Sequence, residues 1–173
     1  MHDRIILLGY MGAGKTTLGK ALAENLHLEF VDLDWYIESK QGKAISQIFA
    51  EQGEDEFRRI ERDMLHEVAS KENVVIAVGG GTPCFFDNID FMNQQGKTVY
   101  IKASTDTLIA HIHMGKTRRP LIDGMTDDEL HRYIDQSMCM REPYYIKAKH
   151  TLTIETIRLQ SQIEAYVEEI KQL

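Results

Sequence analysis

Cysteine and proline are scarce in this sequence. The two cysteines, Cys84 and Cys139, are far apart and form no C-x-x-C motif, so the sequence indicates neither a disulfide framework nor a zinc site. Only three prolines occur, and no linker rich in serine, glycine and proline divides the chain, which we expect to fold as one domain over residues 1–173. This low cysteine content suits a reducing cytosol, and we expect a cytoplasmic protein.

A long apolar run and an excess of positive charge are also missing. No stretch approaches the roughly 20 apolar residues of a membrane span, and residues 1–10 do not have the form of a signal peptide. The formal net charge is −7, which argues against nucleic acid or an anionic membrane as a partner. We therefore expect neither partner. With only nine arginines in the chain, each one matters if the protein binds an anion.

The stretch Gly9–Thr17 reads GYMGAGKTT and fits the pattern G-x-x-x-x-G-K-[ST]. The apolar run at 5–8 predicts a buried strand before it, and apolar residues spaced i, i+3, i+4 and i+8 predict a helix after it. A strand, a glycine-rich loop and a helix in this order form the context that a phosphate-binding loop requires. We therefore interpret the stretch as a phosphate-binding loop rather than as a turn that binds nothing.

The chemistry of such a loop lies mainly in its backbone. Glycines let the chain curl until its N–H groups face phosphate oxygens, and the positive end of the helix dipole adds to that field. Lys15 supplies a mobile positive charge at the β- and γ-phosphates, and the Thr16 hydroxyl is a ligand for Mg²⁺. The sequence thus predicts that a nucleoside triphosphate is bound by Gly12, Ala13, Gly14, Lys15, Thr16 and Thr17.

Strand and helix patterns alternate along the rest of the chain, which favours an α/β fold. Strands are expected at about 4–8, 28–32, 74–78, 98–101 and 150–154. Helices are expected from the phosphate loop to about residue 25, at about 54–70, 105–114 and 127–141, and at the C-terminal end of the sequence.

Two carboxylates, Asp32 and Asp34, stand at the end of the strand expected at 28–32. Side chains at i and i+2 of a strand point the same way, so both are expected on one side of the strand end. In a phosphate-loop protein that end of the sheet faces the phosphates, and one carboxylate can then serve Mg²⁺ while the other serves the nucleophile. The alternative is a solvated acidic turn, and the phosphate loop nearby favours the functional interpretation.

Arg58 and Glu61 lie three residues apart on the helix expected at 54–70, so they can pair beside its apolar stripe. One interpretation is a surface ion pair that contributes little to stability. The other is a guanidinium that Glu61 holds in place so that it can bind a substrate carboxylate through two hydrogen bonds. The spacing by itself favours the surface pair and leaves the second interpretation open.

Two further segments carry glycine or arginine in positions that favour binding. Gly79–Gly81 follows the most strand-like run of the chain, where an open α/β sheet binds its ligands, and three glycines let a ligand approach the backbone closely. The segment 115–124 is basic and ends in glycine on both sides, which is typical of a mobile lid that brings Arg118 and Arg119 onto a phosphoryl group. The alternative is an ordinary exposed basic loop.

No catalytic or metal-binding role is expected for the histidines, and Cys84, close behind the three glycines, is interpreted as a bystander. The seven histidines form no H-E-x-x-H motif, and His111 and His113, two apart on an expected helix, face different sides. We expect all seven to be structural or solvated.

Six motifs in order resemble the shikimate kinase family along essentially the whole chain. They are GYMGAGKTTLGKALA at 9–23, DLD at 32–34, FRRIE at 57–61, VGGGT at 78–82, RRPL at 118–121 and REPYY at 141–145. The resemblance implies a three-layer phosphate-loop fold, with a five-stranded parallel sheet, helices on both faces and a mobile lid at about 112–125. It also implies a monomer that transfers the γ-phosphoryl group of ATP to the 3-hydroxyl of shikimate in aromatic amino acid biosynthesis.

The same resemblance assigns roles at the matching positions of this sequence. Asp34 resembles the residue that orients and deprotonates the substrate hydroxyl, with Lys15 and Arg119 as the groups that neutralise the transferring phosphoryl group. The implied shikimate contacts are Asp34, Arg58, Gly80 and Arg141, and the implied Mg²⁺ shell is Thr16 and Asp32. Arg119 also resembles the family's lid contact to the nucleotide phosphates, whereas the pattern does not require Arg118. The segment 151–160 offers no clear match to an adenine contact, so none is predicted.

Three other functions also involve a phosphate-binding loop, and the sequence disfavours each of them. A gluconate-type sugar-acid kinase also phosphorylates an anionic polyol, but the triple glycine and the R-P-L motif argue against it. An adenylate-kinase-like enzyme is disfavoured because the charges on the acceptor side suit a small carboxylate. A nucleotide-dependent switch would need no acceptor, and the guanine-reading motif N-K-x-D is absent.

Overall fold

A computed structural model describes residues 3–115 and 120–173, and within them five strands form one parallel sheet. The strands are β1 (Arg4–Leu8), β2 (Glu29–Asp32), β3 (Val74–Ala77), β4 (Lys97–Ala103) and β5 (His150–Ile154), in the spatial order β2-β3-β1-β4-β5. All four neighbouring pairs are parallel. The expected five-stranded parallel sheet is therefore confirmed.

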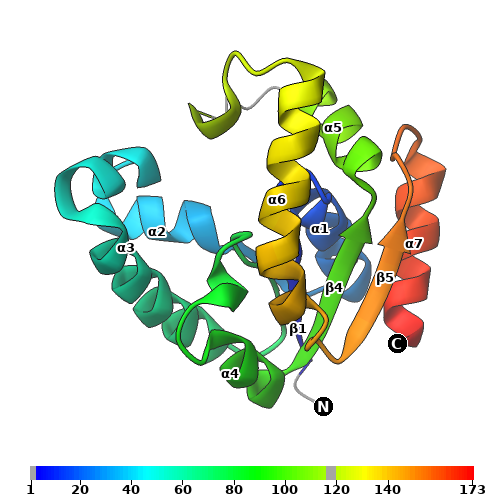
Figure 1. Ribbon diagram of the computed structural model, residues 1–173. Helices are drawn as coiled ribbons and strands as arrows, with labels where there is room; N and C mark the ends of the chain where they lie inside the picture. The colour runs from blue at the N-terminus through cyan, green and yellow to red at the C-terminus, as the bar shows by residue number, and fades with distance from the viewer. Residues whose placement is uncertain (1–2, 116–119) are drawn as a thin grey trace.

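Helices cover both faces of this sheet (Figure 1). They are α1 (Lys15–Leu26), α2 (Leu33–Gln41), α3 (Ile45–Ala69), α4 (Asn88–Gln95), α5 (Thr105–Met114), α6 (Asp127–Tyr145) and α7 (Gln160–Gln172), with short 3₁₀ turns η1 (Thr82–Cys84) and η2 (Pro120–Ile122). Helix α1 packs against α7, whereas α6 lies over the opposite face of the sheet, in front of β1 and β4 in Figure 1. Right-handed crossovers in opposite directions from β1 and from β4 require this division.

The core is built from strand residues that are buried on both faces. In β1, Ile6, Leu7 and Leu8 are fully buried, and every residue of β3 is buried. A parallel strand covered on both faces reads as a continuous apolar run, which explains why these two strands were the clearest in the sequence. No helix in the described ranges is both long enough and apolar enough to span a membrane.

The strand order determines where the candidate site lies. Strands β2, β3 and β1 are neighbours, and their carboxyl ends lead into Asp32, the triple glycine and the phosphate loop respectively. Asp32 pairs in register with Ala77, and Leu7 pairs with the same residue from the other side. Three segments that are far apart in the sequence therefore meet at one edge of the sheet, where open α/β folds bind ligands.

The structure corrects several sequence-based expectations. Asp34 is not on a strand end but in the first turn of α2, a helix that the sequence pattern did not predict, so the argument from i and i+2 along a strand was wrong. Helix α4 was also missed. Gly53 has φ 81° and ψ 172° and interrupts α3. Helix α6 continues through Pro143 to Tyr145, so Arg141 is inside the helix rather than at its end. A proline in a last turn removes only one hydrogen bond from the helix.

Candidate functional site

The phosphate loop has the geometry that its sequence predicts. Gly12 and Gly14 have φ of 82° and 81°, in the left-handed region that favours glycine. Helix α1 begins at Lys15, directly after Gly14, so its first backbone N–H groups open toward the loop. The Lys15 Nζ donates to the carbonyls of Gly9 at 2.8 Å and Tyr10 at 2.9 Å, which holds the ammonium across the mouth of the loop.

The side-chain oxygens of Thr16 and Asp32 lie next to each other. The Thr16 hydroxyl donates to Asp32 Oδ2 at 2.8 Å, while Asp32 Oδ1 caps α2 by accepting from the backbone N–H of Asp34 and Trp35. Hydroxyl and carboxylate oxygens suit Mg²⁺, which also keeps several waters and binds substrate phosphates. No group of three or more His, Cys, Asp or Glu side chains that could hold a metal ion occurs within the described residues.

Asp34 is an unusual carboxyl because its surroundings disfavour its charge. Burial is the main cause that raises the pKa of Asp34 to about 6, and the neighbouring charges of Asp32 and Glu61 raise it further, whereas Lys15 lowers it. An aspartate with a pKa near the working pH can exchange a proton with a hydroxyl, which is the property of a general base. The raised pKa supports the role that the sequence resemblance implies for Asp34, and the role itself stays a prediction.

Arg58 is held by a buried carboxylate. Its Nη1 donates to Glu61 Oε2 at 2.8 Å, and the Glu61 side chain is only 1% exposed. The other oxygen of Glu61 accepts from the Thr82 hydroxyl at 2.5 Å, and the guanidinium lies 4.0 Å from the centre of the Phe85 ring. The interpretation as a surface ion pair is therefore wrong, and the structure supports a guanidinium fixed in one orientation.

The triple glycine lies at the centre of this arrangement. A Cβ on Gly79 would stand 2.8 Å from Asp34 Oδ1, and a Cβ on Gly81 would stand 2.7 Å from Arg58 Nη2. A Cβ on Gly80 would stand 3.3 Å from Arg141 Nη1. The first two separations are shorter than van der Waals contact allows, so glycine at these positions lets the functional side chains lie directly against the backbone.

Arg141 reaches the site from α6, and a tyrosine on the same helix fixes the glycine beside it. The Arg141 guanidinium lies 5.3 Å from the Tyr10 ring centre, within cation–π range. The Tyr145 hydroxyl donates to the Gly80 carbonyl at 2.5 Å, and the Tyr145 side chain is fully buried. Sequence reasoning gave Tyr145 no role, although it belongs to the REPYY motif that contains Arg141.

Three other sequence expectations have different outcomes. Arg118 and Arg119 lie outside the described residues, so the lid assignment stays a prediction. Burial raises the pKa of the Cys84 thiol to about 11, which keeps it protonated and unreactive near neutral pH. His111, which was interpreted only as structural or solvated, contacts the phosphate loop through the Gly12 carbonyl.

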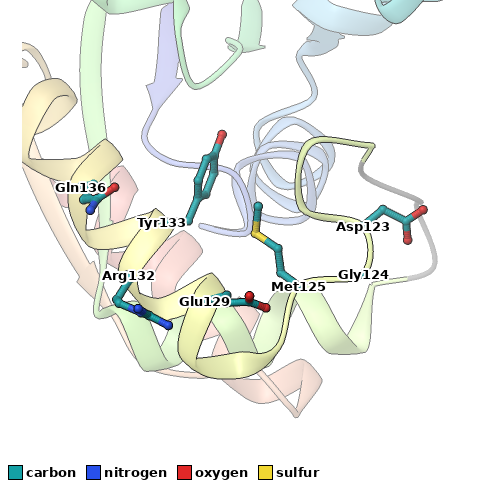
Figure 2. A pocket seen from close by; sticks show the side chains of 7 residues that line it. All are labelled: Asp123, Gly124, Met125, Glu129, Arg132, Tyr133 and Gln136. Atoms are coloured by element: carbon teal, nitrogen blue, oxygen red, sulfur yellow. The ribbon is translucent and has the colours of Figure 1, made fainter.

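A separate cavity of about 470 Å³ lies beside the amino-terminal half of α6. Figure 2 shows its lining, which comes from the segment around Gly124 and from side chains of α6 that include Arg132 and Tyr133. Asp123, Gly124 and Met125 belong to the segment expected as a lid, but no residue of the phosphate loop or of the triple glycine lines this cavity. Its shape therefore gives no evidence about the phosphate loop or the triple glycine.

Comparison with known proteins relates this chain to one family. A family model described as shikimate kinase matches residues 11–172. A curated shikimate kinase of Bacteroides thetaiotaomicron is 48% identical over 170 residues, which cover 98% of this chain and 97% of the relative. The solved structure of a shikimate kinase from the same organism has a TM-score of 0.97 at 47% identity and covers 99% of this chain and 98% of its own. A shikimate kinase from Acinetobacter baumannii, solved in complex with shikimate, has a TM-score of 0.84 at 34% identity, with coverage of 99% and 92%.

The raised pKa of Asp34 predicts a pH-dependent effect on stability. A carboxyl with a pKa of about 6 in the folded state and 3.8 as its ordinary value destabilises the fold when it is ionised, so the cost is absent below pH 4 and complete above pH 6. Asp34→Asn should therefore raise the free energy of unfolding at pH 7.5 by on the order of 2 kcal/mol and have almost no effect at pH 4. Urea unfolding at both pH values measures this difference.

The exposed Asp55 on α3 provides a matched control. Asp55→Asn also removes one negative charge, but this charge is in contact with solvent and not buried. A gain for Asp34→Asn of equal size at both pH values would contradict the assigned cause, and so would an equal gain for Asp55→Asn at pH 7.5.

Proposed function

The chain belongs to the shikimate kinase family, and we propose that it transfers the γ-phosphoryl group of ATP to the 3-hydroxyl of shikimate, giving 3-phosphoshikimate and ADP. It is a kinase, as its relatives are. The product feeds aromatic amino acid biosynthesis, which is the pathway implied by the family resemblance.

One observation carries the assignment of roles to residues. Asp34, Arg58 and Arg141 come from three different helices, and all three lie against consecutive glycines of one loop. That loop follows β3, next to the phosphate loop after β1. A substrate with one carboxylate and one reactive hydroxyl matches this set, because two guanidinium groups suit the carboxylate and one basic carboxylate suits the hydroxyl. Phosphoryl transfer needs such positioning more than it needs covalent chemistry.

In the proposed reaction, Arg58 and Arg141 bind the shikimate carboxylate and the backbone at Gly80 contacts the ring. Asp34 accepts the proton of the 3-hydroxyl while that oxygen forms a bond to the γ-phosphorus. The bond between the γ-phosphorus and the β,γ-bridging oxygen breaks, and ADP leaves. Lys15 neutralises the negative charge that develops on the β- and γ-phosphate oxygens.

The remaining roles concern the nucleotide and its metal. We assign the phosphate contacts to the backbone and side chains of Gly12, Ala13, Gly14, Lys15, Thr16 and Thr17. Thr16 and Asp32 would hold Mg²⁺, with Asp32 acting through a water, and the ion would supply charge neutralisation at the β- and γ-phosphates. We also assign Arg119, with the lid at about 112–125, to the nucleotide phosphates during transfer, where closure would exclude water as a competing acceptor.

We further propose that residues 1–173 act as a single kinase domain, as a monomer and in the cytoplasm. The support for the first proposal is that the described strands all belong to one sheet. The two cysteines are free in the structure, which suits a reducing compartment.

A coupled assay of ADP release over shikimate, quinate and gluconate tests the function itself. We expect turnover of shikimate that exceeds the rate with either other acid by at least roughly 100-fold, because the site has to match both a carboxylate and the position of one hydroxyl. Release of ADP with gluconate but not with shikimate would show that the chain is a sugar-acid kinase. Release that depends on no acceptor would exclude both.

If Asp34 is a general base, its substitution should lower the catalytic rate and leave the affinity for nucleotide unchanged. Asp34→Asn should leave the Kd for ADP within twofold of the original value and lower kcat by roughly 100-fold or more, which is the range for a lost acid–base group. The original enzyme should also lose activity as the pH falls through about 6, because protonation of Asp34 removes the base. Stopped assays across pH 5–8 and ADP calorimetry measure both effects. An unchanged kcat in the variant would refute the role.

Substituting lysine for Arg58 tests the carboxylate clamp, by which we mean the guanidinium groups of Arg58 and Arg141 that are assigned to the shikimate carboxylate. Arg58→Lys keeps the charge but replaces a planar group that makes two hydrogen bonds with a single ammonium, so the KM for shikimate should rise by roughly tenfold while the KM for ATP stays within twofold. The neighbouring Arg59 is the matched control, because its side chain is 70% exposed and pairs only with Glu56 among the interactions described for it. Arg59→Lys should change neither constant. A rise confined to the KM for ATP would show that Arg58 contacts the nucleotide and that its assignment to shikimate is wrong.

A further inference from the structure

His111 connects two segments that flank the nucleotide side of the sheet. Its Nδ1 lies 2.7 Å from the carbonyl oxygen of Gly12 in the phosphate loop. Its Nε2 lies 2.8 Å from the backbone nitrogen of Ile157, in the segment between β5 and α7. His111 itself is on α5, 99 residues after Gly12 and 46 residues before Ile157. One imidazole ring therefore joins three segments that are distant in the sequence.

The partners determine which nitrogen carries the proton. A carbonyl oxygen can only accept, so Nδ1 must be the donor to Gly12. A backbone N–H can only donate, so Nε2 must be the unprotonated acceptor from Ile157. Only the neutral ring with hydrogen on Nδ1 satisfies both bonds. The ring is therefore a bridge with a fixed direction, and neither a hydrocarbon nor a single-ended polar side chain reproduces it.

The bridge acts on a peptide unit that is held at both ends. The Gly12 carbonyl accepts from His111, and the N–H of the following residue, Ala13, donates to the Tyr10 carbonyl at 3.1 Å. A trans peptide is planar, so these two bonds together fix its orientation. Packing adds to this, because a Cβ on Gly12 would stand 3.1 Å from the Leu108 carbonyl of α5. The phosphate loop is thus braced from outside by one helix.

The other end of the bridge lies where the rest of a nucleotide would extend. In the order β2-β3-β1-β4-β5, three of the residues assigned to shikimate, namely Asp34, Arg58 and Gly80, follow β2 or β3 on one side of the phosphate loop. The opposite side is bounded by the segment after β5, and Ile157 Cδ1 lies 3.5 Å from where a Cβ on Gly14 would stand. The sequence pattern identified no adenine contact in this segment. The structure shows instead how its backbone is tied to the loop.

We propose that His111 is a positioning residue of the nucleotide site, whose neutral imidazole holds the phosphate loop and the segment at Ile157 in fixed register before the nucleotide binds. This proposal rests on the assignment of ATP to the phosphate loop and not on the identity of the acceptor. Preorganisation reduces the ordering that binding requires, so the loss of the bridge should weaken the binding of nucleotide and leave the binding of the acceptor unchanged.

The test measures ADP and shikimate separately by calorimetry. His111→Leu removes both hydrogen bonds, His111→Asn keeps a donor near the position of Nδ1, and His111→Gln keeps an acceptor near the position of Nε2. We expect His111→Leu to raise the Kd for ADP by roughly five- to tenfold, the effect of one to two lost hydrogen bonds, and to leave the Kd for shikimate within twofold. The KM for ATP should rise by the same factor while kcat stays within twofold. At least one of the amide variants should recover part of the affinity for ADP.

His113 supplies the matched control, since it lies on the same helix, is exposed and pairs with Asp127 rather than with the phosphate loop. His113→Ala should leave both dissociation constants unchanged. Thermal unfolding without ligand shows whether each variant is folded. An unchanged Kd for ADP in His111→Leu would overturn the proposal, and so would an equal loss of affinity for ADP and shikimate. Failure of both amide variants to recover any affinity would overturn it as well. ADP binding needs no acceptor turnover, so these outcomes are independent of whether shikimate is the substrate.

Discussion

The contact between three consecutive glycines and three charged side chains is the constraint on which the acceptor side of the site depends. Asp34, Arg58 and Arg141 each lie so close to the Gly79–Gly81 backbone that a methyl group there would displace them or press against them. Ordering three consecutive glycines costs conformational entropy. In return, the bare backbone of the loop leaves room for three charged side chains to lie directly against it. The loop is ordered by its surroundings, through the Tyr145 hydroxyl on the Gly80 carbonyl and the η1 turn that follows.

This constraint also explains why the buried ion pair is retained. Burying Glu61 and most of Arg58 is costly unless each remaining donor and acceptor finds a partner. Glu61 uses both oxygens, one for Arg58 and one for Thr82, and the guanidinium packs on Phe85. Thr82 begins η1, directly after the triple glycine, so the same bonds that hold the arginine also hold the loop. Clamp and loop are thus one structural unit, although they are encoded in separate segments.

What the sequence could predict was local, and what it missed depended on distant partners. The phosphate loop carries its own strand, glycines and helix start within about a dozen residues, so its geometry followed from pattern alone. The burial of Arg58 could not, because Thr82 lies 21 residues beyond Glu61. Helix α2 was missed because its nine residues show no clear apolar stripe and because it begins directly after Asp32, which both ends β2 and caps the helix. The expectation that His111 is structural or solvated agrees with its two backbone contacts, but its partners could not be named because they become neighbours only in the folded chain.

The charges around Asp34 bear on why such a kinase needs cations at its phosphates. Asp32 and Glu61 already raise the pKa of Asp34, and only Lys15 among its main neighbours lowers it. A triphosphate entering the adjacent loop brings more negative charge, which by itself would raise the pKa of Asp34 further and leave the base protonated. A cation at Thr16 and Asp32 would neutralise this charge close to Asp34, and the clamp arginines would offset the charge of the substrate carboxylate. In the proposed reaction, positive charge in this site would therefore have a second effect beyond stabilising the transferring group, because it would keep Asp34 ionised when both substrates are bound.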